Sequence, residues 1–402
     1  MFVSTLRSGP GPQGDPTVTA PQPYSGIRIL DLTFKLGRYA TKLFADLGAE
    51  VIRIEPQAGL PDRIASSGAD YAFAFFNTSK KSIVLDLDSE AGRRAFVPLA
   101  ESAAVIFLEA GGPLSGDLVW LRSLNPNAVI THIAPYGLCG PLEHVPATDL
   151  TLQAAGGIAW LSGRTDAPPL RLPVDQSVMI ASVYAAVATA ICLMDTEAGG
   201  GGHLVDVSAQ EAIAHSLQNA LQVFDLEGRI SRRGGEGTRD ATEDIFPCKD
   251  GYVFLAAPIV LGISWKALLG WMQDTGSPAA EILSAPAWSD SKWRTTLEAK
   301  DAFRAAFEPF LADKTKREAT EQALRRKIVM SAVSRISDVL QDEQLAYRDY
   351  FVTVADPRLG ETTLPGAPYR LSAPVWRAAA APSLGQHDAD LLAAAPTRLR
   401  QA

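Results

Sequence analysis

The chain is poor in the residues on which several common protein classes depend. Its 402 residues include three cysteines, Cys139, Cys192 and Cys248, which are widely spaced and odd in number. This pattern excludes a disulfide framework, matches no zinc site and suits a reducing cytoplasm. The five histidines are scattered, and none has metal-ligand spacing from a cysteine or carboxylate. We therefore expect a cytoplasmic protein without a metal site.

Positive charge is also sparse. Lysine and arginine number 37 against 45 aspartates and glutamates, and the longest basic run, 325–327, has three residues. A net charge of -8 without a basic cluster argues against a surface that binds nucleic acid or anionic lipid. Neither partner is expected, and a polyanionic ligand would need local basic residues.

Long apolar runs are almost absent. The charge-free run 176–194 is long enough to cross a bilayer, but it contains glutamine, serine and threonine and is flanked by acidic residues. It predicts a buried helix rather than a membrane span. Residues 1–25 are rich in proline and glycine and lack an apolar signal-peptide core, so they predict a flexible arm.

The N-terminal half alternates strand and helix patterns. The expected strands are 27–32, 50–54, 82–87, 103–108 and 128–133, with helices around 38–47 and 89–100. Because these strands are continuously apolar, both faces of the sheet should be buried, which favours a parallel sheet between helix layers. The chain is therefore predicted to be α/β and Rossmann-like.

Two frequent active-site motifs are missing. The turn after the first expected strand reads DLTFKLGRY and lacks the glycines that let a dinucleotide pyrophosphate approach the backbone. No Gly-x-Ser-x-Gly sequence is present, so a serine hydrolase has no support. Neither a nicotinamide enzyme nor a serine hydrolase is expected.

Six stretches, in order, carry a resemblance to one family. The longest is 168–208, which reads as loop, long helix, glycine turn and strand. The others are GIRILDL, KLFADLGAEVIRIEP, NTSKKSIVLDLDSEAGR, FPCKDGYVFL and PSLGQHDADLL. Together they resemble the class III CoA-transferases, which include the carnitine, formyl and bile-acid CoA-transferases.

The resemblance implies an arrangement of domains. Residues 26–226 would form the first part of a large Rossmann-like domain, 227–330 a smaller α+β domain with its linker, and 331–402 the return to the large domain. In this family two such chains interlock. Some members, including those that act on aryl-substituted succinates, resemble two-subunit assemblies.

The resemblance also implies a nucleophile that this chain lacks. Class III transferases attack an acyl-CoA thioester with an ionised aspartate, giving a mixed anhydride and then an aspartyl-CoA thioester. Gapless alignment backward from HLVDVS places that aspartate on Val178. Asp175 lies three residues earlier and has two interpretations. It is either an N-cap after Pro173 or a displaced nucleophile.

The expected nucleotide site lacks some of the family's residues and retains others. Where relatives have an Asn-Phe-Arg-Pro-Gly-like turn, this chain reads FLEAGGP, with Glu109 in place of a basic residue. Arg53, Lys80 and Lys81 stand where relatives often place basic residues near the nucleotide. These three are either CoA-binding residues or a solvated surface.

Two glycine-containing segments complete the implied CoA site. Tyr136 and Gly137 resemble the family's Gly-Phe-Gly turn beside the thioester. Gly234, Gly235 and Gly237 precede FPCKDGY, where transferases place a lid whose backbone N–H groups approach an oxyanion. A plain interdomain loop would explain these three glycines as well.

Two hypotheses from different classes follow. The chain is a non-catalytic subunit that completes a heteromer with a catalytic class III paralogue, or it is a self-sufficient transferase, paired with itself, that uses Asp175. CoA and acyl-CoA would be substrates, with no permanently bound cofactor. An α-methylacyl-CoA racemase is disfavoured, because the racemase histidine aligns with Thr148 and its aspartate is also missing.

Overall fold

The computed structural model describes residues 21–63, 70–164, 167–233, 239–373 and 375–392. The chain divides into two compact units. Unit 1 contains residues 1–158, 171–218 and 349–402, and unit 2 contains residues 159–170 and 219–348. Most of the expected N-terminal arm lies outside the described residues. Its last part is held on unit 1, where the side-chain amide of Gln22 donates to Asp46 O and Val375 O.

Unit 1 is built on a six-stranded sheet in the order β3-β2-β1-β4-β5-β6, and every pairing is parallel. This is the doubly wound order of Rossmann folds, so the α/β prediction is confirmed. The strands are β1 (Arg28–Asp31), β2 (Glu50–Glu55), β3 (Lys81–Val84), β4 (Val105–Glu109), β5 (Val129–Ala134) and β6 (Leu204–Ser208).

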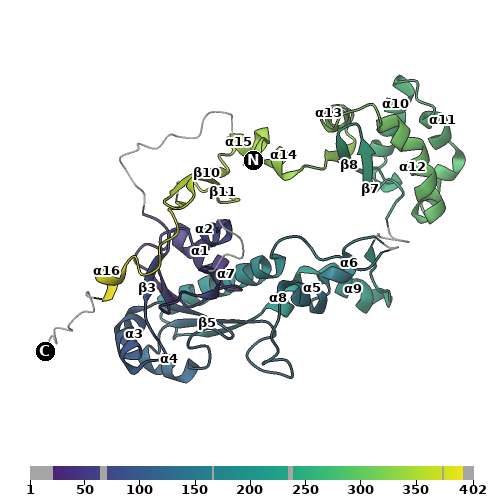
Figure 1. Cartoon of the computed structure of the whole chain (residues 1–402). Coiled ribbons are helices and arrows are strands. Elements are labelled where there is room, and N and C mark those ends of the chain that lie inside the picture. Colours follow the sequence, from purple (N-terminus) through teal and green to yellow (C-terminus); the bar gives the residue numbers. More distant parts are fainter. Residues whose placement is uncertain (1–20, 64–69, 165–166, 234–238, 374, 393–402) are drawn as a thin grey trace. The chain divides into compact units, whose positions relative to one another are not determined.

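The two faces of the sheet carry separate apolar cores, as the continuously apolar strands require. The helices α1 (Arg38–Asp46) and α7 (Gln176–Glu197) contribute to the core on one face. The helices α3 (Glu90–Ser102) and α4 (Leu118–Leu124) contribute to the core on the other (Figure 1). The remaining elements of this unit are η1 (Pro61–Arg63), α2 (Tyr71–Phe76), α5 (Asp149–Ala155), α8 (Ala209–Ser216), β10 (Phe351–Asp356), β11 (Gly360–Pro365) and α16 (Asp388–Leu392).

Helix α7 is the long apolar helix that the sequence predicts. Among the described residues it alone has the length and composition of a membrane span, with 44% of its apolar window buried. Its buried polar groups are used inside the unit, since Ser182 donates to the carbonyl of Leu36 and Thr189 bonds to Thr131. Such bonds explain it as a core helix. Its other face is an exposed apolar stripe of Val183, Val187, Ile191 and Met194, hereafter the α7 stripe.

The C-terminal return closes one edge of this sheet. The N–H of Ser82 in β3 donates to His387 Nδ1 at 3.2 Å, and the N–H of His387 donates back to Ser82 O at 3.0 Å. The N–H of Val84 donates to Asp388 at 2.8 Å. His387 therefore has a structural role.

Unit 2 has its own core. The strands β7 (Asp244–Cys248) and β8 (Gly251–Ala256) form a hairpin, and β9 (Val329–Ala332) adds a third antiparallel strand. Aromatic side chains, Phe246 and Phe303 among them, fill the core. The helices and turns are α10 (Ile263–Asp274), α11 (Ala279–Leu283), α12 (Leu297–Leu311), α13 (Lys316–Arg326), α14 (Ile336–Leu340), α15 (Glu343–Tyr347), η3 (Ile259–Leu261), η4 (Pro286–Ser289) and η5 (Trp293–Thr295).

Two short helices lie where the chain changes unit, α6 (Ile158–Leu161) and α9 (Gln218–Glu227). Residues 159–170 belong to unit 2 although the sequence places them in the large domain. The reason is a set of bonds to the segment after α9. The indole of Trp160 donates to Ser231 O at 2.9 Å, and Arg233 donates to the carbonyls of Arg164 and Ala167.

Candidate functional site

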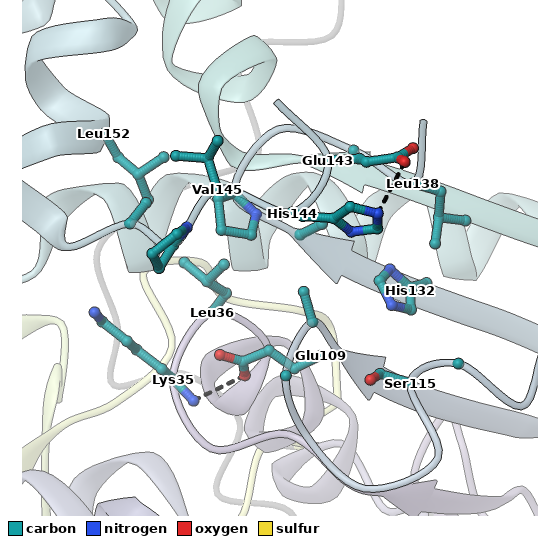
Figure 2. A pocket seen from close by; sticks show the side chains of 18 of the residues that line it. Lys35, Leu36, Glu109, Ser115, His132, Leu138, Glu143, His144, Val145 and Leu152 are labelled. Carbon is teal, nitrogen blue, oxygen red and sulfur yellow. Dashed lines mark hydrogen bonds and ion pairs between the residues drawn. The ribbon is translucent and has the colours of Figure 1, made fainter. Parts of the chain in front are cut away.

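A cavity of about 660 Å³ opens at the carboxyl ends of β1, β4 and β5, which is where ligands bind in doubly wound sheets (Figure 2). Three loops surround it, one after each strand. The lining residues used below are Lys35, Leu36, Glu109, Ser115, His132, Gly137, Leu138, Glu143, His144, Val145 and Leu152. We call this space the main cavity.

Glu109 places a carboxylate at the positive end of α1. Its side chain is 2% exposed, and one oxygen accepts N–H bonds from Phe34 at 3.0 Å and Lys35 at 2.8 Å. A more distant third donor is the N–H of Gly37, at 3.5 Å. Burial raises the pKa of Glu109 above its ordinary value, against the opposing effect of these backbone donors. The backbone N–H groups of the loop that leads into α1 are thus occupied by the protein's own carboxylate.

A second, smaller cavity of about 320 Å³ lies at the ends of β2, β3 and β4. Gly111 lines both cavities, so the turn after β4 separates them. Three carboxylates, Glu55, Asp86 and Asp88, line the smaller cavity, and its lining includes no lysine or arginine. A diphosphate in this space would meet negative charge.

Val178 is fully buried. It lies in the first turns of α7 with 0% exposure and belongs to the apolar core that also contains Leu36, Ile133 and Leu152. Leu36 and Leu152 line the main cavity, whereas Val178 does not. The position that aligns with the family nucleophile is therefore behind the cavity wall.

Asp175 is the residue before α7, but its side chain does not cap that helix. Its carboxylate, which is 43% exposed, accepts a bond from Arg38 Nη2 at 3.1 Å. The capping bond comes instead from Asp149 of α5, which accepts the N–H of Ser177 at 3.0 Å. The interpretation of Asp175 as a side-chain cap is wrong, because a residue distant in sequence already satisfies that N–H.

Arg53 and Lys80 lie in the interior of unit 1. Arg53 is 0% exposed, donates to Thr33 O at 3.0 Å and forms an ion pair with Asp62. Lys80 donates to Asp31 at 2.9 Å, and burial lowers its pKa to about 8. The expectation of a solvated surface is therefore not met for these two residues.

Lys81 differs from its neighbour. Its half-exposed side chain pairs with Glu50 at 2.8 Å on the outside of β2. None of the three basic residues lines either cavity described above. Their assignment to a nucleotide remains a prediction.

Of the other predicted site residues, some line the main cavity and others do not. Gly137 lines the main cavity at a φ of 92°, where a side chain would be strained. Tyr136 packs against the core instead. Gly234, Gly235 and Gly237 lie outside the described residues. The structure thus brings Gly137 together with Glu109, and neither Asp175 nor Arg53 joins them at the cavity.

Sequence reasoning missed His132. It stands in β5 within VITHIA, is 3% exposed and lines the main cavity. Burial lowers its pKa, and the nearby carboxylate of Asp206 partly opposes that effect. The signal in the sequence that could have identified it is a histidine ring within a strand that is otherwise expected to be buried.

Two further sequence predictions concern the missing racemase histidine and the absence of a metal site. Thr148, at the place of the racemase histidine, caps α5 by accepting the N–H of Thr151 at 3.3 Å. Within the described part of the chain, no group of three or more histidine, cysteine, aspartate or glutamate side chains has metal-binding geometry.

Comparison with known proteins agrees with the fold. The sequence profile of CoA-transferase family III matches residues 24–388. The BbsE subunit of succinyl-CoA:(R)-benzylsuccinate CoA-transferase from Thauera aromatica is 35% identical over 389 residues, covering 92% of this chain and 94% of that protein. The alpha subunit of succinyl-CoA–L-malate CoA-transferase from Chloroflexus aurantiacus is 27% identical over 365 residues, covering 87% and 83% respectively.

The fold also has a solved counterpart. The crystal structure of a CAIB/BAIF family protein from Brucella suis superimposes with a TM-score of 0.79 at 21% identity, covering 94% of this chain and all of that one. The chain belongs to CoA-transferase family III. The resemblance seen in the sequence is thereby confirmed.

Proposed function

We propose that this chain is the non-catalytic subunit of a heteromeric class III CoA-transferase. Its partner would be a paralogue that carries the nucleophilic aspartate, and the two chains would interlock. The reaction of the assembly is transfer of CoA from an acyl-CoA to a carboxylic acid. CoA and acyl-CoA are substrates.

The observation that carries the proposal is the burial of Val178. Valine cannot attack a thioester, and at 0% exposure behind the cavity wall the position offers no space for a reacting carbonyl. Catalytic groups must lie within about 3–3.5 Å of the atom they attack. A simple exchange of valine for aspartate would therefore not restore a nucleophilic site.

The region where the nucleotide of CoA is expected supports the same conclusion. Glu109 occupies backbone N–H groups just before α1, and three carboxylates line the neighbouring cavity, of which Glu55 is paired with Arg63. Two unit charges of like sign at about 4 Å repel by roughly 4 kcal/mol near a protein surface. The chain alone is therefore expected to bind CoA weakly.

The α7 stripe supports a protein partner. Val183, Val187, Ile191 and Met194 follow one another at helical spacing and are all exposed. We assign this stripe to the partner subunit rather than to a lipid, since the polar groups on the opposite face of the helix are tied into the core. The relatives from Thauera and Chloroflexus are themselves named as subunits.

In such an assembly the chemistry runs on the partner's aspartate. Its carboxylate attacks the donor thioester, which releases CoA thiolate and leaves a mixed anhydride. The thiolate then attacks the aspartyl carbonyl of the anhydride, which frees the donor acid and forms an aspartyl-CoA thioester. The acceptor carboxylate then attacks the aspartyl-CoA thioester, which releases CoA thiolate and forms a second mixed anhydride. The thiolate attacks the acceptor's carbonyl in that anhydride, which gives the acceptor's CoA thioester and frees the aspartate.

One observation favours the alternative of a self-sufficient enzyme. Because Asp175 is not bound as a cap, Arg38 is the one described residue that holds its 43% exposed carboxylate, and an ionised carboxylate is what the reaction requires. Hydroxylamine trapping distinguishes the two. After incubation with acyl-CoA and hydroxylamine, a hydroxamate on Asp175 would establish the alternative, and we expect none.

The deciding experiment is expression of the chain alone and together with a class III paralogue that has aspartate at the aligned position. CoA exchange should appear only in the co-expressed sample, and native mass spectrometry should show mixed assemblies. Ile191→Glu should prevent mixing, whereas Val119→Glu, at an exposed site on α4, serves as the matched control. A homodimer of this chain that transfers CoA by itself contradicts the proposal.

A further inference from the structure

The buried carboxylate of Glu109 uses only one of its two oxygens. The N–H groups of Phe34, Lys35 and, more distantly, Gly37 all donate to Oε2. The other oxygen, Oε1, accepts no bond from a described residue, and it is not one of the enclosed polar atoms that lack a partner. It therefore has accessible surface. Because Glu109 lines the main cavity and not the smaller one, that surface faces the main cavity (Figure 2).

No cation pairs with this carboxylate within the described part of the chain. The charge of Glu109 acts on Arg38, but the guanidinium is bonded to Asp175 at 3.1 Å. Lys35 offers Glu109 its backbone N–H, whereas in Figure 2 its amine points away from the carboxylate. Burial raises the pKa of Glu109 in spite of the backbone donors, as expected of a carboxylate without a counter-charge.

A buried charge without an opposite charge is rare in proteins. Buried carboxylates are paired with a cation or coordinate a metal, because the loss of hydration is otherwise too costly. Glu109 is 2% exposed, and its free oxygen opens into a cavity of about 660 Å³. The missing cation therefore has to come from the cavity.

The rest of the lining determines which kind of cation fits. Within the described residues no group of three or more acidic, histidine or cysteine side chains has metal-binding geometry, so a metal ion would lack further ligands. Much of the wall is apolar, including Leu36, Leu138 and Val145. An ammonium group on an apolar body matches both the carboxylate and this wall.

The net charge of the cavity also favours a cation over an anion. Glu143 adds a second carboxylate to the lining, beside His144 at 3.1 Å. Lys35 is the one lysine or arginine that lines the cavity. An entering anion would thus meet two carboxylates, whereas an ammonium group would be attracted to them.

We propose that the main cavity binds a small primary amine in its ammonium form, which has a largely apolar body and donates to Oε1 of Glu109. The cavity volume lies in the range of small-molecule sites. The inference goes beyond the proposed function, because every residue of the site belongs to unit 1 of this chain. Binding requires neither CoA nor a partner subunit.

Three probes test the proposal on the full chain: 2-phenylethylamine, 2-phenylethanol and 3-phenylpropionate. They share a phenyl ring and a two-carbon arm and differ in carrying an ammonium, a hydroxyl or a carboxylate. Calorimetry at neutral pH should show the amine binding about tenfold or more tightly than the alcohol, which is the usual effect of a hydrogen bond to a charged group. The carboxylate should bind most weakly.

The variants assign the effect to one oxygen. In Glu109→Gln the amide oxygen can remain among the backbone N–H groups, which turns the NH₂ group toward the cavity and replaces an acceptor with a donor. The preference for the amine over the alcohol should be lost, while the alcohol still binds. Glu143→Gln is the matched control, because it removes one negative charge from a more exposed part of the same cavity. It should keep the preference.

A measurement on the unaltered chain covers the case in which Glu109→Gln fails to fold. A bound ammonium stabilises the ionised carboxylate of Glu109. The carboxyl ¹³C resonance of Glu109 should therefore titrate at a lower pH in the presence of 2-phenylethylamine, and 2-phenylethanol should not move that midpoint.

Several outcomes would overturn the proposal. They are an amine that binds no more tightly than the alcohol, tighter binding of 3-phenylpropionate, a preference that survives Glu109→Gln, or a Glu109 titration that the amine does not change. An equal loss of the preference in Glu143→Gln would also overturn it, since the attraction would then come from the general charge of the cavity. None of these outcomes bears on whether the chain needs a catalytic partner.

Discussion

Replacing Val178 with aspartate tests whether this position is a decayed active site or part of the core. The side chain is 0% exposed, so the change removes a fully buried apolar group, at a cost of roughly 1.5–3 kcal/mol. It also places a carboxylate without a charged partner in the core, which adds roughly 3–5 kcal/mol. The free energy of unfolding should therefore fall by about 5 kcal/mol or more, and CoA exchange should not appear.

Urea denaturation across a range of pH measures both parts of this cost. Burial would raise the pKa of the new carboxyl in the folded state above its value in the unfolded chain. In the interval between the two pKa values the folded state binds more protons, so stability falls as pH rises. The deficit of Val178→Asp relative to the unaltered chain should thus be smallest near pH 4 and grow toward pH 8.

Val178→Thr is the matched control, because threonine has nearly the same shape and adds one hydroxyl without a charge. It should cost about 1–3 kcal/mol with no such dependence on pH. The reasoning is refuted if Val178→Asp lies within about 1 kcal/mol of the unaltered chain. CoA exchange by the isolated variant would refute it as well, since both results mean that position 178 faces an open site.

Three other substitutions have defined outcomes. Because burial raises the pKa of Glu109, the stability of the unaltered chain relative to Glu109→Gln should fall as pH rises through that pKa, measured by urea denaturation from pH 4 to 8. Asp175→Asn leaves the buried Arg38 without its ion pair and should cost about 1 kcal/mol by thermal unfolding, with CoA exchange of the assembly unchanged; a large loss of exchange would indicate catalysis. Lys80→Met should cost about 3–5 kcal/mol because its carboxylate partner stays buried, whereas the half-exposed Lys81→Met should cost less than about 1 kcal/mol; equal costs would contradict the burial difference.

Periodicity and turn chemistry were enough to predict the main elements of unit 1. The charge-free run 176–194 begins where α7 begins, at Gln176, and the helix continues only three residues further, to Glu197. The expected strand 50–54 is β2 with one residue added. These features are local, because an apolar run between charged or glycine-rich boundaries needs no distant residue to define it.

The site depended on contacts that no local pattern contains. The cap of α7 comes from Asp149, 28 positions before the N–H that it accepts, and Glu109 accepts from Lys35, 74 positions earlier. Charge alone was misleading for Arg53, for which the sequence left CoA binding or a solvated surface open, because it and Arg294 are the largest fully buried side chains among those described. The charge of Arg53 is compensated in the interior by ion pairs with Glu55 and Asp62, and its guanidinium also donates to Thr33 O, 20 positions earlier in the chain.

The hydrogen bonds between β3 and the C-terminal return can form only after nearly the whole chain has been synthesised. Ser82 and His387 are 305 positions apart, and all of unit 2 is translated between them. Until the ribosome has released the last residues, the N–H groups of Ser82 and Val84 lack these partners, and an open strand edge invites pairing with other chains. The nascent protein must therefore hold an unfinished sheet for most of its translation, and chaperones have that interval in which to act. In an interlocked assembly the partner would have to be threaded before this final segment docks, so exchange between finished dimers would require the return to detach first.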